Sequence, residues 1–211
     1  MTISLKITDS IKTIEKNINS AIAEYINTTL SSNANNIIRE VKSYIPLWIK
    51  NQPEIISLLS SDTQSLAGYF GIPSERGSIV ENIVSSVVGS LSFKFVKYKD
   101  SLSRGGFELY IQPDNFLNLL GLPQGHTVYN GGDLHWLDWL LLRGDEIIIS
   151  NYRYNPAKGF GRSGLGNMVK GDVFRVPPQF SGTSSDNFIT RALIGDQQDK
   201  IITSIFNKYL G

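Results

Sequence analysis

The strongest constraint on the fold is a helical repeat of apolar side chains that fills most of the first fifty residues. Because residues three or four apart share one face of a helix, this spacing predicts an amphipathic helix, with Asp9 or Ser10 as its N-cap. The repeat has two parts, which are Ile11, Ile14, Ile18, Ala21, Ile22, Tyr25, Ile26 and Leu30, and then Ala34, Ile37, Ile38, Val41, Tyr44 and Ile45. The sequence SSNANN separates the two parts and Pro46 follows, so residues 8–50 form either one long bent helix or two helices in series. We expect the first stripe to lie on the protein's own sheet, with a contact to another subunit as the alternative.

Two shorter helices are predicted next. Pro53 suits the first turn of a helix, since proline has no N–H to leave unpaired there. Residues 73–77 predict a turn, and the apolar residues of 79–88 fit a helix that ends at Gly89, although their valine content would also suit a strand.

A β-hairpin is predicted after these helices. Residues 90–99 and 106–112 alternate apolar and polar side chains, and the short sequence DSLSRG joins them. This pattern is typical of two antiparallel strands. A helical turn at 115–120 and a loop at 121–132 are expected to follow.

The last third of the chain begins with a strongly apolar segment. Residues 134–144 predict a helix with Asp133 as N-cap and Gly144 as C-cap. The run Ile147 to Ile149 is typical of a buried strand. A mobile loop, a short strand near 172–176 and a final amphipathic helix at 199–210 complete the chain.

These elements indicate an α+β protein, in which long N-terminal helices pack on a small, mostly antiparallel sheet and a C-terminal helix closes over it. We expect one domain over residues 1–211, with a helical part at 1–62 and a sheet-containing core at 63–211. Long loops are expected at 121–132 and 155–185.

Composition excludes several classes of function. The chain has 20 basic and 19 acidic residues and a formal charge of +1, which disfavours general binding to nucleic acid or to acidic membranes. It has no cysteine, so disulfides, thiolate metal sites and cysteine nucleophiles are excluded. The N-terminus lacks the apolar core of a secretory signal, and no apolar run is long enough to cross a membrane, so we expect assembly in the cytoplasm.

No catalytic set emerges from the motifs. The sequence GFGRSGLG at 159–166 lacks the lysine of a Walker loop and the flanking strand and helix of a dinucleotide fold, and we interpret it as a flexible loop that reaches a neighbouring subunit. Ser163 has Gly161 two residues before it, but the glycine that a nucleophile elbow needs two residues after it is replaced by leucine. We therefore predict no cofactor.

The histidines were considered as metal ligands. The chain has only two, His126 and His135, and both lie near Asp133 and Asp138 in the sequence. Their spacing matches no standard zinc motif such as HExxH, so we interpret them as ordinary partly buried or interfacial histidines and predict no metal.

Aromatic and arginine side chains near the apolar helix are the candidate binding residues. Tryptophan, tyrosine and arginine are concentrated at the centres of protein interfaces. Core packing is the first interpretation of the two tryptophans, and an interface anchor is the alternative. The candidate interface residues are Trp136, Trp139, Arg143, Tyr152, Arg153, Tyr154, Arg162 and Arg175.

Over roughly residues 134 to 211 the chain resembles the neck and tail-completion proteins of tailed bacteriophages. In that pattern a tryptophan-rich helix precedes a strand, a Gly/Arg/Ser-rich loop and a segment that leads into the last helix. The residues that carry the resemblance are Trp136, Trp139, Leu140 and Gly144; Gly161, Arg162, Ser163, Gly164 and Met168; and Val176, Pro177, Phe180, Ser181, Gly182, Thr183, Asp186, Asn187, Phe188, Ile189, Arg191, Ala192 and Leu193. Residues 58–73 are similar to the family's linker ahead of its sheet.

The resemblance implies a structural virion protein with no enzymatic activity. Such a protein forms a cyclic homo-oligomer, a hexamer or alternatively a dodecamer, at the neck or at the head-proximal end of the tail. It would contact other neck, connector, tail-tube or sheath proteins, with no membrane and no sequence-specific nucleic acid, although DNA could pass through the ring. The alternative from another class is a small hydrolase that uses His126 or His135 with a nearby aspartate, and a non-viral adaptor is a third possibility.

Overall fold

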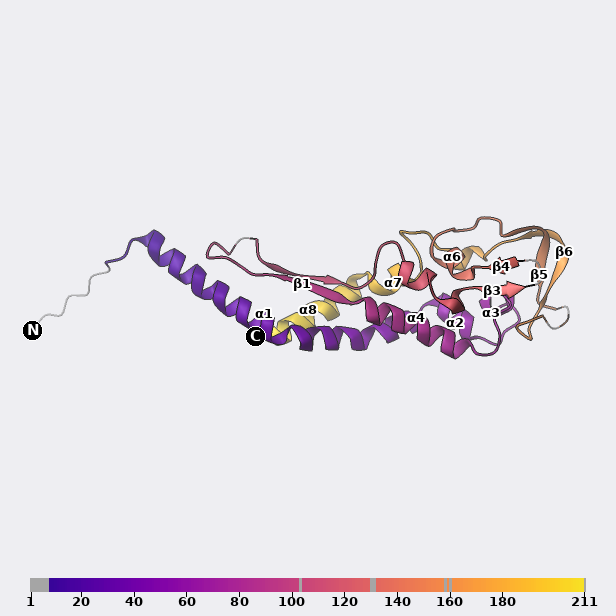
Figure 1. Cartoon of the computed structure of the whole chain (residues 1–211), viewed down its shortest axis with the longest axis horizontal. Helices are drawn as coiled ribbons and strands as arrows, with labels where there is room; N and C mark the ends of the chain where they lie inside the picture. Colours follow the sequence, from indigo (N-terminus) through magenta and orange to yellow (C-terminus); the bar gives the residue numbers. More distant parts are fainter. Residues whose placement is uncertain (1–7, 103, 130–131, 158, 160, 211) are drawn as a thin grey trace, which may run out of the picture.

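The computed structural model describes residues 8–102, 104–129, 132–157, 159 and 161–210, and the fold is α+β, about 52% helical and 17% strand. The predicted fold class is therefore confirmed. The described strands are divided among three two-stranded antiparallel sheets. The molecule is elongated, with a helical end and an end formed by the later strands (Figure 1).

One helix, α1 (Ile11–Lys50), runs along most of the molecule, so the first repeat forms a single element. Ser10 caps it by accepting a hydrogen bond from the Thr13 N–H. Pro46 lies inside the helix and does not end it. The helix bends where it leaves the body (Figure 1), in the region where Ser32 Oγ donates to the Thr29 carbonyl, a bond that commonly bends helices.

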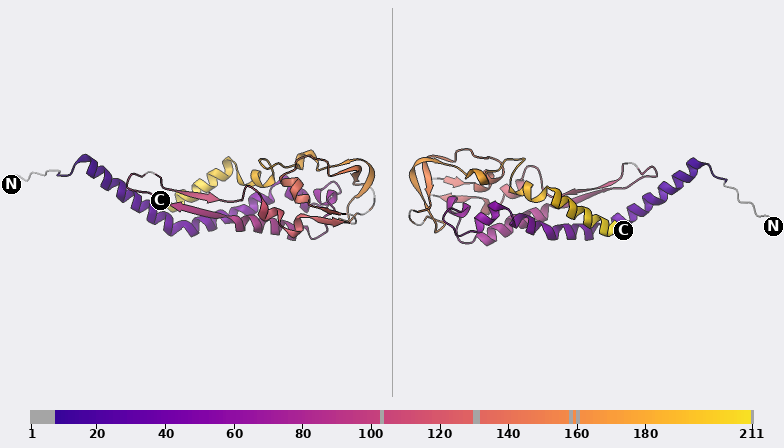
Figure 2. Two further views of the ribbon diagram at one scale, coloured as in Figure 1. Left: turned by 45° about the horizontal axis from the view of Figure 1, so that its top comes forward. Right: turned by 180° about the vertical axis from the view of Figure 1, so that it is seen from behind.

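The two halves of α1 have different surroundings. From Leu30 to Ile49 most of its apolar positions are buried in the core, although Leu47 is 57% exposed. The expectation that the first stripe lies on a sheet is wrong for its first part, because Ile11, Ile18 and Tyr25 are 75%, 53% and 64% exposed. Its last members, Ile26 and Leu30, do pack on the core. Both further views show this part of the helix extending away from the body (Figure 2).

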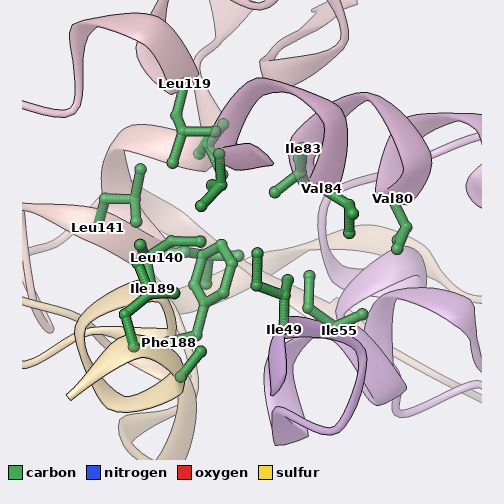
Figure 3. Packing of buried hydrophobic residues seen from close by; sticks show 14 of the residues in the cluster. Ile49, Ile55, Val80, Ile83, Val84, Leu119, Leu140, Leu141, Phe188 and Ile189 are labelled. Atoms are coloured by element: carbon green, nitrogen blue, oxygen red, sulfur yellow. The ribbon is translucent and has the colours of Figure 1, made fainter. Parts of the chain in front are cut away.

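Short helices build the core around the second half of α1. They are α2 (Pro53–Leu59), α3 (Leu66–Tyr69), α4 (Arg76–Ser90), α5 (Leu117–Leu120), α6 (Trp136–Leu141) and α7 (Phe188–Leu193). Figure 3 shows Ile49, Ile83 and Phe188 meeting in this core. The helix expected at 79–88 is longer than predicted, because it begins inside the expected turn and continues past Gly89.

The predicted hairpin is confirmed as β1 (Ser92–Val96) and β2 (Gly106–Tyr110). The last helix, α8 (Asp196–Leu210), lies against α1 and also reaches this hairpin, where the Phe206 and Phe107 rings meet edge to face at 4.9 Å. The expected closure of the C-terminal helix over strands is thus confirmed for one sheet.

The region around residue 134 differs most from prediction. The helix there is only α6, six residues long, because residues 132–134 are a strand and Asp133 caps nothing. The expected buried strand at Ile147–Ile149 is wrong: Ile147 is 53% exposed, and strand β5 (Ile149–Asn155) begins where the isoleucine run ends. Gly144 is not the cap residue but adopts a φ of 62°, which glycine tolerates without strain, and its N–H donates to the Gly182 carbonyl.

The two expected long loops are only partly loops. The first contains a 3-10 turn at Pro123–Gly125 and strand β3 (Thr127–Tyr129), which pairs with β4 (Gly132–Leu134). The second contains β6 (Asn167–Phe174), paired with β5, and a 3-10 turn at Pro178–Phe180. In the described residues, no helix is long and apolar enough to cross a membrane.

Candidate functional site

The two tryptophans of α6 have different environments. Trp136 is completely buried and its ring stacks on Phe70 at 5.9 Å, so it is a core residue and presents no surface to a partner. Trp139 is half-buried, and the Arg143 guanidinium lies 5.1 Å from the centre of its ring. A cation over an aromatic face is a stabilising arrangement, and here it leaves both side chains partly accessible.

Most of the other candidate interface residues lie on the β5–β6 hairpin or beside it. Tyr152 and Arg153 are exposed. Arg175 is also exposed, and its guanidinium lies 3.9 Å from the Asp145 carboxylate. These three residues therefore lie on or directly after the β5–β6 hairpin, which forms one end of the molecule (Figure 1).

Tyr154, on strand β5, makes contacts within the fold. Its hydroxyl donates to the Thr63 carbonyl at 2.6 Å and accepts from the Gly166 N–H at 2.8 Å. Its ring packs on Tyr69 at 4.5 Å, and burial raises the pKa of the Tyr154 phenol. Tyr154 thus ties the glycine-rich loop to the body.

That loop was expected to be mobile, and the structure corrects this for its described residues. The Gly161 N–H donates to the Gly166 carbonyl at 2.8 Å, and the buried Arg76 guanidinium donates to the Ser163 carbonyl at 3.2 Å. Arg162 extends across to donate to the Val128 carbonyl of β3. The loop is therefore held in place by its own chain, and Lys158 and Phe160 lie outside the described residues.

A pocket of about 260 Å³ opens beside the loop. Its lining includes Tyr69, Tyr129, Tyr154, Arg162 and Phe174. Among the described residues the walls are mostly aromatic and backbone, with a single charged side chain. No pair of groups in this described part of the lining forms an acid and base.

The structure does bring together a polar cluster that sequence spacing did not favour. His126 Nδ1 lies 2.7 Å from both carboxylate oxygens of Asp133, and His135 Nε2 lies 3.4 Å from Asp133 Oδ2. The two imidazole rings stack at 5.1 Å with an angle of 15°. One donor atom from each residue can be chosen so that all three lie within 4.8 Å of one another.

The β3–β4 hairpin produces this cluster by its register. Thr127 pairs with Leu134 and Val128 with Asp133, so His126 and His135 occupy the next opposite positions at the end of the ladder. Side chains two apart on a strand share a face, which places Asp133 beside His135. The sequence signal was Asn-Gly-Gly at 130–132, a turn-favouring tripeptide between the two histidines that we had interpreted as part of a loop.

The cluster does not extend to the other residues considered with it. Asp138, on α6, is outside the group of donors that the described residues bring together. Ser163 Oγ accepts a hydrogen bond from the Leu165 N–H, and within the described chain it has no histidine partner. A Ser-His-Asp arrangement is therefore not assembled.

Comparison with known proteins adds no family: no protein-family model, curated protein or solved structure matches this chain.

Proposed function

We propose that this chain is a structural virion protein of a tailed bacteriophage, which forms a homo-oligomeric ring at the neck or at the head-proximal end of the tail. The observation that carries the proposal is the first half of α1. It extends beyond the body and exposes apolar side chains that a single chain leaves uncovered. The resemblance of the last third to neck and tail-completion proteins supplies the biological setting.

The exposed stripe has the spacing of a helix-packing seam. Ile11, Ile14, Ile18, Ala21 and Tyr25 recur at alternating intervals of three and four residues. This is the repeat by which one helix packs against another. We define these five residues, with Ile22 beside them, as the α1 stripe.

The α1 stripe is distinct from the face by which the same helix joins the body. Ala23 and Leu30, seven residues apart, are both buried on the body side. Successive residues on a helix are about 100° apart, so the neighbouring Ile22, which is 41% exposed, faces away from that side. A second element has to cover the stripe if its apolar area is to be removed from water.

A second copy of the chain is the partner that fits. The stripe itself carries no charged side chain, so two copies of it can pack against each other without burying a charge. The chain as a whole has a formal charge of only +1, so repeated copies repel weakly. In a ring each helix would have a neighbour to cover it, and this repeats one contact around a closed symmetry.

The opposite end of the molecule is suited to contact with other virion proteins. Tyr152, Arg153 and Arg175 are exposed there, and these residue types dominate binding hot spots. The proposal thus assigns self-assembly to the α1 stripe and head-to-tail contacts to the β5–β6 end. The hydrolase alternative is less well supported, because neither histidine has a nucleophile beside it in the described residues.

The test is the mass of the protein in solution by multi-angle light scattering, with negative-stain images of large species. The wild-type chain is compared with Ile11→Lys/Ile18→Lys, which places two charges in the stripe. The matched control is Thr13→Lys/Ser20→Lys, which adds the same charges, with the same spacing of seven residues, on another face of the helix.

We expect wild type and control to form a ring of six or twelve subunits and the stripe variant to be monomeric. A wild-type protein that remains monomeric at its highest soluble concentration would overturn the proposal that the chain forms a ring. A stripe variant that assembles as well as the control would show that subunits meet elsewhere.

A further inference from the structure

We propose that His126, Asp133 and His135 form a binding site for a divalent transition-metal cation, with Zn²⁺ the ion that best matches the donors. The proposal concerns one end of the β3–β4 hairpin and does not depend on ring assembly or on a viral role. It reverses the interpretation from spacing alone, because the register of the hairpin places three potential ligands on one face.

The geometry suits a single ion. A tetrahedral Zn²⁺ with bonds of about 2.0–2.2 Å holds its donors about 3.4 Å apart. The donors of the cluster are separated by 2.7 Å for His126 to Asp133 and 3.4 Å for His135 to Asp133, and all lie within 4.8 Å. Small side-chain rotations can bring all three to bonding distance, because His135 is 55% exposed and the other two are also in contact with solvent.

The donor set also selects the class of cation. Two imidazole nitrogens and one carboxylate suit Zn²⁺ and its neighbours in the transition series, whereas Mg²⁺ and Ca²⁺ prefer sites made of oxygen atoms. One negative carboxylate against a divalent charge leaves the site with a net positive charge. Three protein ligands leave a fourth position, which is open to water or to a donor from another molecule.

A bound ion would add a link between the starts of β3 and α6. His126 directly precedes β3, and His135 directly precedes α6, whose Trp136 is completely buried. The ion would therefore close the open end of the hairpin and attach it to the start of a core helix. Arg162 donates to Val128 of the same hairpin, so the glycine-rich loop would be stabilised indirectly.

The test uses the full-length chain without a histidine tag, stripped of metal by a chelator. Zn²⁺ is titrated by calorimetry, and Co²⁺ is added separately so that its visible spectrum reports the coordination. The variants are His126→Ala and His135→Ala. Asp138→Asn is the matched control, because Asp138 is a nearby carboxylate outside the donor group.

We expect one Zn²⁺ per chain, a Co²⁺ spectrum typical of tetrahedral coordination, and no comparable binding of Mg²⁺. Each histidine variant should lose about tenfold or more in Zn²⁺ affinity while Asp138→Asn keeps it. Zn²⁺ should also raise the melting temperature of wild type but not of His135→Ala, since a ligand that binds only the folded state stabilises it.

Circular dichroism of each variant shows whether a loss of binding reflects a loss of fold. If a variant is unfolded, His126→Gln or His135→Gln, which keeps polarity at the site, replaces it in the comparison. Absence of Zn²⁺ binding to wild type, or equal affinity in folded histidine variants, would overturn the proposal.

Discussion

The described residues include a buried carboxylate whose environment affects stability. Glu54 is 1% exposed, and one of its oxygens accepts a hydrogen bond from the Arg191 guanidinium. The other oxygen, Oε2, has no partner among the described residues. Burial raises the pKa of Glu54 above its ordinary value of 4.5, although Arg191 acts in the opposite direction. Desolvation therefore exceeds the attraction to the neighbouring cation.

This environment predicts a pH dependence of the free energy of unfolding. Because the folded state binds the Glu54 proton more tightly than the unfolded state, the contribution of Glu54 is fully present below pH 4.5 and is lost as the pH rises through the raised pKa. Each unit by which the pKa is raised corresponds to about 1.4 kcal/mol. We expect urea unfolding to show a larger loss of stability between pH 4.5 and 7 in wild type than in Glu54→Gln.

The control for this comparison is Glu24→Gln, at an exposed glutamate of α1. Its pH profile should follow that of wild type. Equal slopes for wild type and Glu54→Gln would show that Glu54 has little effect on the pH dependence of stability.

At the residue scale, the sequence predicted whether a side chain is buried better than it predicted which residues that side chain contacts. Core packing was correctly the first interpretation of Trp136, because Leu134, Leu137 and Leu140 lie close to it in the sequence. The meeting of His126, Asp133 and His135 could not be predicted from their spacing. It depends on the register of the β3–β4 hairpin. That register could be predicted only if β3 and β4, which have three residues each, were first recognised as strands.

At the scale of elements, the joint between α8 and the β1–β2 hairpin is built on aromatic contacts. Phe206 meets Phe107 edge to face at 4.9 Å, and Phe107 stacks on Phe93 at 5.1 Å across the two strands. A two-stranded hairpin is marginally stable alone, so it needs such packing against a helix. The same helix is attached to α1 by Lys208 and Tyr209, which both hydrogen-bond to the Glu40 carboxylate.

We predict that the rings of Phe107 and Phe206 are energetically coupled. A double-mutant cycle with Phe107→Leu and Phe206→Leu should give a coupling energy of about 1 kcal/mol, since an edge-to-face pair contributes beyond its buried area. Urea unfolding of wild type, the two single variants and the double variant measures this coupling energy.

The matched comparison pairs Phe206→Leu with Phe70→Leu, because Phe70 stacks on Trp136 in another part of the core. The changes in the free energy of unfolding caused by these two substitutions should add within about 0.5 kcal/mol. Additive effects for Phe107 and Phe206 would mean that the contact holds the hairpin only weakly.

Long periodic elements were predictable, and short exposed ones were not. The repeat of α1 and the alternation of β1 and β2 each gather apolar side chains on one face, which leaves a pattern in the sequence. Strand β5 reads ISNYRYN and has mostly exposed side chains, so no such pattern marks it. The isoleucines before it suggested a buried strand, but a short apolar run does not show which residues the tertiary structure covers.

At the scale of the whole molecule, the part of α1 that packs on the body is separate from the part that we propose for assembly. From residue 8 to residue 22 no side chain is buried, whereas Ala23 and Leu30 begin the attachment to the body. The Asn27 side chain also holds the hairpin, donating to the Tyr98 carbonyl and accepting from the Tyr98 N–H. The body therefore has its own contacts without the first turns of the helix.

This separation predicts the effect of removing residues 1–19. The truncation deletes Ile11, Ile14 and Ile18 from the α1 stripe and leaves Ser20, a good N-cap residue, near the new start of the helix. The deletion removes the Lys16–Asp100 ion pair, whose atoms are 3.9 Å apart, but exposed pairs contribute only about 0–1 kcal/mol. We expect the free energy of unfolding to change by about 1 kcal/mol or less and the light-scattering mass to fall to that of a monomer.

Removal of residues 1–7 alone is the control and should leave the mass of the wild-type assembly unchanged, because it keeps Ser10 and the whole stripe. A truncated chain that is folded and still forms rings would place the subunit contact on the body. A truncated chain that cannot fold would mean that the first turns of α1 stabilise each subunit, and the exposed stripe would then have to be explained by folding. Only a folded monomer would show that the first turns of α1 serve assembly. A helical segment as short as these turns is marginally stable alone in water, so packing against a second subunit would stabilise it.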